Sequence, residues 1–154
     1  DATLLMMKAR KTCLVPTYAV LERNAATGGP ELSAVVAARS RAELPVMAGL
    51  SARASKLGVP VVAGSDVRYD DQFSLRQQLA AMIAVGMSPA AVIRSATSVA
   101  ARCLSIQNRT GRIRAGLEAD LVVVRQNPLR SIDALDHVVL VINDGAVAVD
   151  NRGN

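Results

Sequence analysis

One acidic side chain directly follows a short apolar run. The run from Val59 to Ala63 has the length of a strand, and Gly64, Ser65 and Asp66 come after it. A continuous apolar run is typical of a parallel strand covered on both faces, and α/β folds bind ligands at the carboxyl ends of such strands. The sequence therefore predicts that Asp66 delivers a carboxylate to a site, with capping of the next helix as the alternative role.

Other residue types that could do chemistry lack a diagnostic spacing. Cys13 and Cys103 stand in apolar surroundings without a CxxC pair, which predicts small core residues of a reducing compartment, and hence a cytoplasmic protein. The segment from Gly111 to Gly116 brackets two arginines, but it lacks the Lys-Ser/Thr of a phosphate loop. We interpret this segment as a turn between strands.

The elements that would position Asp66 alternate along the first part of the chain. Helical patterns cover residues 1–10 and 31–57, the second kinked or divided at Pro45. Apolar, β-branched runs at 12–17 and 59–66 predict strands, with loop after the first strand and at residues 24–30. Helices that alternate with strands in this way predict a parallel sheet and an α/β fold.

The second part of the chain changes from helical to β character. A helix is predicted from about residue 72 to 85, and Gly86 would cap it. Ser88 and Pro89 then predict the N-cap and first turn of another helix, whose apolar stripe extends to Leu104. Further on, the sequence predicts a strand at 119–124 and a hairpin at 137–149 that turns at Asp144-Gly145.

Composition limits the classes of function. The 154 residues are 51% hydrophobic and 2% aromatic, as expected for an aliphatic globular domain. The net charge of +5 is spread along the chain, which argues against a nucleic-acid partner, and no apolar run approaches the ~18 residues of a membrane span. The first residue is Asp1 and not Met, so we expect a piece of a longer gene product.

An ordered series of short motifs resembles the carboxyl-terminal part of a metal-dependent amidohydrolase, of the imidazolonepropionase and Xaa-Pro dipeptidase type. Each motif is weak alone, but together their order and spacing are specific. The series comprises Leu14-Val-Pro-Thr17, Gly58 to Asp66, Gly86-Met-Ser-Pro-Ala90, Ala96 to Ala101, Gly111 to Val124, Asn127-Pro128 and Val139 to Val149.

The resemblance implies a fold and a division of the chain. It implies the last strands and helices of a β/α (TIM-like) barrel over residues 1–107, with barrel strands at 12–17 and 59–66. Residues 108–154 would form the carboxyl-terminal portion of a small β-sandwich. The family's other metal ligands, on earlier strands, would precede Asp1, and His137 opens a sandwich strand and does not replace them.

The resemblance also implies a reaction, the hydrolysis of a C–N bond in an amide, cyclic amide or dipeptide by metal-activated water. Asp66 would be a ligand of a divalent metal, zinc favoured, and would pass a proton from the water to the leaving amine. Thr17, Tyr18, Arg68 and Tyr69 would lie on loops at the barrel mouth and contact a small-molecule substrate, or be ordinary solvated residues.

This chain alone supplies one ligand, so we expect it to bind no metal and to be catalytically incomplete without a missing N-terminal portion. The alternative hypothesis is a non-catalytic α/β binding or oligomerisation module derived from a barrel fragment. Both hypotheses predict a homo-oligomer formed through exposed strand edges.

Overall fold

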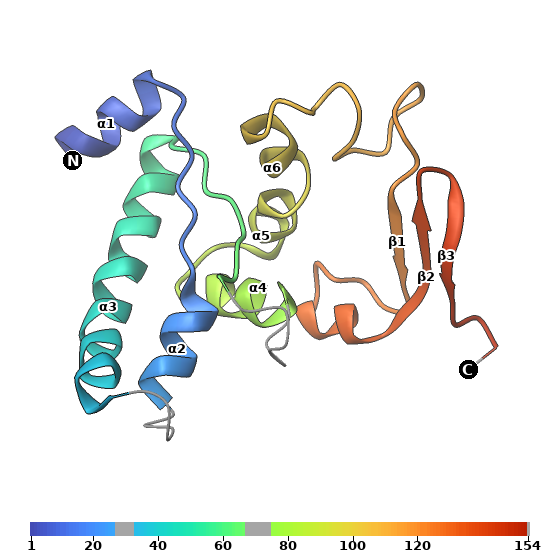
Figure 1. Ribbon diagram of the computed structural model, residues 1–154. Helices are drawn as coiled ribbons and strands as arrows, with labels where there is room; N and C mark the ends of the chain where they lie inside the picture. The colour runs from blue at the N-terminus through green and yellow to red at the C-terminus, as the bar shows by residue number, and fades with distance from the viewer. Residues whose placement is uncertain (27–32, 67–74, 154) are drawn as a thin grey trace. The chain divides into compact units, whose positions relative to one another are not determined.

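The computed structural model describes residues 1–26, 33–66 and 75–153 (Figure 1). The chain forms two compact units, Asp1–Met87 and Ser88–Asn154. The predicted boundary after residue 107 divides the chain by architecture, into a barrel part and a sandwich part, and not by compactness. This predicted boundary stays a prediction.

The first unit contains four helices among its described residues: α1 Ala2–Ala9, α2 Tyr18–Ala26, α3 Ala34–Leu57 and α4 Leu75–Ala84. Helix α2 packs against α3 and α4, and α1 packs against α3. Local signals define the ends of α3, since the Ser33 side chain accepts a hydrogen bond from the Val36 N–H and Gly58 ends the helix at φ 81°. Pro45 lies inside this single helix, so the alternative of two separate helices is wrong.

Helix α2 corrects the prediction of loop after residue 17 and at residues 24–26. The helix contains good helix formers, among them Leu21, Glu22 and Arg23, and its first residues Tyr18 and Ala19 are fully buried. Burial of this first turn stabilises the helix. The β-branched residues before it and the Gly-Gly-Pro sequence after it had favoured a strand and a loop in the prediction.

The two predicted strands of the first unit lie side by side and run parallel. Leu14 pairs with Val61, the Leu14 N–H donates to the Pro60 carbonyl at 2.9 Å, and the Val62 N–H donates to the Leu14 carbonyl at 2.9 Å. This pairing confirms the parallel arrangement, although it is one isolated bridge and not a long ladder. The described residues do not close a barrel, which therefore stays a prediction.

The second unit begins with α5 Pro89–Ser95 and α6 Ser98–Cys103, where the sequence predicted one helix up to residue 104. The predicted N-cap is confirmed, since the Ser88 hydroxyl accepts from the Ala91 N–H at 3.3 Å. The break comes at Thr97, whose backbone leaves the helical region (φ −130°, ψ −100°) while its hydroxyl donates to the Ile93 carbonyl at 2.8 Å. A hydroxyl that donates to the carbonyl four residues earlier competes with the helical backbone hydrogen bonds in this way.

A three-stranded antiparallel sheet follows, in the order β1 Leu121–Val124, β2 Val138–Asn143 and β3 Ala146–Asp150. The strands and the hairpin are confirmed, and Asp144 (φ 49°) and Gly145 (φ 78°) form its left-handed turn. A short 3-10 helix, η1 Ile132–Asp136, connects β1 to β2 and was not predicted. Gly111 and Gly116 have positive φ in a segment of turns, which confirms the predicted turn. The segment lies between α6 and β1, so the prediction that it joins two strands is wrong.

Two further predictions concern the cysteines and membrane spans. Cys13 and Cys103 are half-buried, so the prediction that they are core residues is wrong; the apolar neighbours in sequence do not enclose them. Among residues 1–26, 33–66 and 75–153, no helix is both long and apolar enough to span a lipid bilayer.

Candidate functional site

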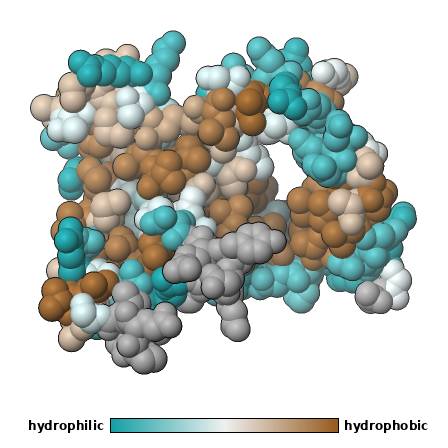
Figure 2. Space-filling view, viewed as in Figure 1, coloured by the Kyte–Doolittle hydropathy of each residue, from teal (hydrophilic) through white to brown (hydrophobic). Residues whose placement is uncertain are grey.

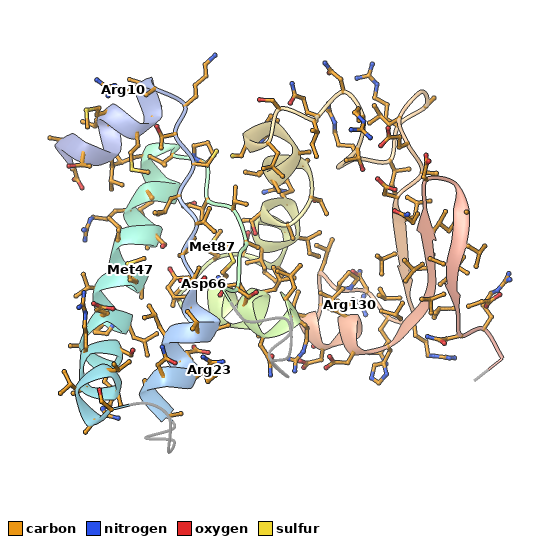
Figure 3. All side chains as sticks on the ribbon, in the orientation of Figure 1. Arg10, Arg23, Met47, Asp66, Met87 and Arg130 are labelled. Carbon is orange, nitrogen blue, oxygen red and sulfur yellow. The ribbon has the colours of Figure 1, made fainter. Side chains whose placement is uncertain are left out.

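Asp66 lies at the end of the described segment that follows α3 (Figure 3). Its side chain is exposed, and its backbone has φ 52°, in the left-handed region that Asp tolerates better than most residues. Asp66 thus follows, along the chain, a segment that pairs in parallel at Val61, and its role at the end of this segment stays a prediction.

The parallel pairing brings a second candidate residue to the same edge. Thr17 follows Leu14 along one segment, and Asp66 follows Val61 along the other, in the same direction. Residues beyond a parallel bridge continue toward one edge of the pair, so Thr17 and Asp66 belong to the same edge. Thr17 is half-buried.

A close approach at Gly64 continues this pairing toward Asp66. A Cβ atom at Gly64 would lie 2.5 Å from Cγ1 of Val15. Such a distance is far below van der Waals contact, so the backbone at Gly64 lies against the Val15 side chain. The two segments thus stay in contact between the Leu14–Val61 bridge and the edge with Thr17 and Asp66.

Tyr18 lies in the interior of the first unit. Its side chain is fully buried, and its hydroxyl donates to the Met47 carbonyl of α3 at 3.2 Å. Burial raises the pKa of the Tyr18 phenol above its ordinary value, with the Ser51 hydroxyl acting in the opposite direction. This is the environment of a packing residue, and it disfavours the prediction that Tyr18 contacts substrate.

Gln78 of α4 is a residue that the sequence reasoning missed. Its side chain is fully buried, its Oε1 accepts from the Ala19 N–H at 2.9 Å, and its Nε2 donates to the Pro16 carbonyl. One signal could have identified it, since Gln78 occupies a position on the apolar face of the helix, between Leu75 and Met82 at helical spacing. A polar residue there needs buried partners.

Two predicted substrate residues, Arg68 and Tyr69, lie outside the described residues. Their assignment stays a prediction.

The described side chains do not provide a complete metal site. Within residues 1–26, 33–66 and 75–153, no group of three or more His, Cys, Asp or Glu side chains is placed to hold a metal ion. Asp66 offers a single carboxylate, and His137 caps η1 in the second unit. Zinc in proteins takes three or four protein ligands, so these residues do not fit the implied metal by themselves.

The second unit has a shallow surface cavity of about 360 Å³, lined by Gln126, Asn127, Arg130 and Ser131. It includes none of the predicted site residues. Its Asn127 and Ser131 side chains accept hydrogen bonds from the Leu129 and Asp133 N–H groups, which is the behaviour of turn-forming residues.

Comparison with known proteins matches nearly the whole chain to one family. The model of the "Amidohydrolase family" matches residues 4–148. Ochratoxinase from Aspergillus niger is 31% identical over 132 residues, which cover 82% of this chain and 26% of the relative.

Solved structures agree with this match. A Xaa-Pro dipeptidase with bound methionine in its active site superimposes with a TM-score of 0.82 at 27% identity, over 96% of this chain and 37% of that one. The A. niger ochratoxinase structure gives a TM-score of 0.85 at 26% identity, over 97% of this chain and 35% of that one. The chain thus spans about a quarter to two fifths of the length of these relatives.

Proposed function

Because this chain belongs to the amidohydrolase family, we propose that it supports the hydrolysis of a C–N bond by an activated water, with Asp66 as its catalytic residue. Relatives named as an ochratoxinase and a Xaa-Pro dipeptidase support a small-molecule amide or dipeptide as substrate. The observation on which the proposal rests is the parallel pairing of Leu14 with Val61, which supports a common edge for Thr17 and Asp66.

The chemistry proposed for Asp66 is proton transfer. Its carboxylate accepts a proton from the attacking water, whose oxygen bonds to the amide carbon. Asp66 then donates this proton to the leaving nitrogen as the C–N bond breaks, so the carboxylate is regenerated. Its exposed side chain is accessible for both transfers.

Substrate contacts are proposed for three further residues. Thr17 would offer a hydroxyl, and Arg68, with its neighbour in sequence Tyr69, would bind a substrate carboxylate. Tyr18 would act through packing, because its hydroxyl is bonded inside the unit.

A divalent metal, zinc by the family resemblance, is proposed for the complete enzyme, where it would supply the electrophile that activates water. Asp66 would be the one ligand from this chain, and the others would come from an N-terminal portion outside this sequence. We therefore expect the 154-residue chain alone to be inactive.

One observation favours a second candidate, the non-catalytic binding or oligomerisation module. Val122, Val147 and Val149 of the sheet are exposed at 59%, 58% and 41%, and Figure 2 shows hydrophobic residues at the surface over the strands of the second unit. Exposed apolar strands favour association with another chain. Light scattering coupled to size-exclusion chromatography measures this association. Hydrolysis by the protein encoded by the whole reading frame distinguishes the two candidates, because this module predicts a homo-oligomer without hydrolytic activity.

The experiment that tests the proposed function begins with the coding sequence upstream of Asp1. The protein encoded by the whole reading frame is assayed with N-acyl amino acids and Xaa-Pro dipeptides, and its metal content is measured by elemental analysis. Hydrolysis by this protein, and neither metal nor hydrolysis with residues 1–154 alone, is the expected result. Stoichiometric metal and turnover by the 154-residue chain would overturn the assignment of the missing ligands to an N-terminal portion.

A further inference from the structure

The backbone from Pro16 to Ala19 is bonded to helix α4 through Gln78. This residue lies in α4, the helix that follows Asp66 in the chain, and its side chain is fully buried. Its carboxamide bonds to the Pro16 carbonyl and to the Ala19 N–H, one on each side of Thr17. Residues from the two ends of the unit thus meet at a single side chain.

We propose that Gln78 is a positioning residue that fixes the backbone around Thr17 relative to helix α4. The inference rests on the proposed function, because it gives Thr17 and Asp66 a common edge at which substrate binds. Gln78 acts through the backbone and touches no reacting atom.

The backbone groups that Gln78 binds explain why a carboxamide is required. The Ala19 N–H belongs to the first turn of α2, where N–H groups have no partner within the helix. Pro16 is fully buried and its carbonyl needs a donor. Only a side chain with one donor and one acceptor satisfies both groups, and Gln has the two atoms on one planar group.

The two hydrogen bonds of Gln78 fix the orientation of the backbone around Thr17 as well as its position. A single hydrogen bond would let the segment pivot about it, whereas two bonds on either side of Thr17 restrict rotation of the peptide units between them. The buried Tyr18 hydroxyl on the Met47 carbonyl anchors the same turn to α3. The backbone from Pro16 to Ala19 is therefore held by both α3 and α4.

Three variants test the inference in the protein encoded by the whole reading frame. Gln78→Met keeps the length of the side chain and removes both hydrogen bonds. Gln78→Glu keeps the shape, accepts from Ala19 in either charge state, and donates to Pro16 only when it is protonated. Leu79→Val is the matched control, because Leu79 is a buried neighbour on α4 that is 3% exposed and makes no polar contact.

The first measurement is hydrogen exchange of the Ala19 amide, followed by NMR. Gln78→Met should accelerate this exchange by about tenfold relative to wild type, as expected for loss of a buried hydrogen bond. Leu79→Val should change the ratio of Ala19 exchange to exchange of other α2 amides by less than about twofold. Equal acceleration in both variants, or none in Gln78→Met, would overturn the inference whether or not the protein is an enzyme.

The second measurement is hydrolysis. Gln78→Met should raise KM by about tenfold with a smaller change in kcat, and the KM ratio of Gln78→Glu to wild type should fall toward one as the pH is lowered and the carboxyl becomes a donor. A KM that changes equally in Gln78→Met and Leu79→Val would reduce Gln78 to a structural residue and overturn its positioning role. Absence of hydrolysis in the wild-type protein would instead overturn the proposed function, and the exchange measurement would still decide whether Gln78 fixes the segment.

Discussion

Replacing Gly64 by alanine tests the close pairing of the two segments that lead to Thr17 and Asp66. Gly64 does not have a positive φ, so alanine is compatible with its backbone and would alone stabilise the protein by about 0.4–1 kcal/mol through the unfolded state. The added Cβ would lie 2.5 Å from Val15 Cγ1, about 1 Å closer than an optimal carbon–carbon contact.

The steric cost should exceed this gain. An extra methyl group in a packed contact destabilises a protein by about 1–3 kcal/mol. The β-branched Val15 side chain has few alternative rotamers that would avoid the new group. Val15 is 48% exposed, so part of the strain can be relieved by moving it toward solvent. We therefore expect Gly64→Ala to lower the free energy of unfolding by about 1–2 kcal/mol.

A double-mutant cycle isolates the contact. Urea unfolding followed by far-UV circular dichroism gives the free energies for wild type, Gly64→Ala, Val15→Ala and the double variant. The double variant should be at least as stable as Gly64→Ala, because the smaller residue 15 leaves space for the new methyl group. If Gly64→Ala is as stable as wild type, or if the two changes are additive, the close approach is refuted.

Three further predictions concern the second unit. Hydrogen bonds from the Asp144 N–H, which has the larger effect, and from the Thr110 hydroxyl lower the pKa of the Asp120 carboxyl. Asp120 should therefore stabilise the fold above pH 3.8, the ordinary pKa, and this contribution should be lost as the pH falls through the folded-state pKa. An NMR titration that gives an unshifted pKa would contradict this. Ser88→Ala should lower the free energy of unfolding by about 1 kcal/mol in urea denaturation through loss of the N-cap, whereas no loss would mean that the 3.3 Å bond is not stabilising. Gly145→Ala should destabilise the hairpin by about 1 kcal/mol because the residue has φ 78°, and unchanged thermal stability would refute that conformation.

Local signals predicted those elements whose ends are encoded by neighbouring residues. Ser88 and Pro89 marked the start of α5, and Asp144-Gly145 marked the hairpin, because a cap or a left-handed turn needs particular side chains within a few residues. The parallel relation of the segments at 12–17 and 59–66 followed from the alternation of helices and strands.

The remaining features depend on contacts between distant residues. Helix α2 was missed because burial of Tyr18 in the tertiary structure, and not a local cap, stabilises its first turn. Gln78 was missed because its partners lie 59 and 62 residues away. For the candidate site, sequence alone predicted Asp66 and Thr17, a prediction that stays open, but not Gln78, whose side chain bonds the backbone on both sides of Thr17.

The most direct test of the central claim compares two aspartates in the active protein. Asp66 and Asp144 are both exposed and both have positive φ, 52° and 49°, a conformation that asparagine also tolerates. The account predicts that Asp66→Asn lowers kcat/KM for amide hydrolysis by at least about 100-fold, while Asp144→Asn changes it by less than about twofold. Equal kcat/KM values for the two variants would contradict the assignment of Asp66 as the catalytic residue of this chain.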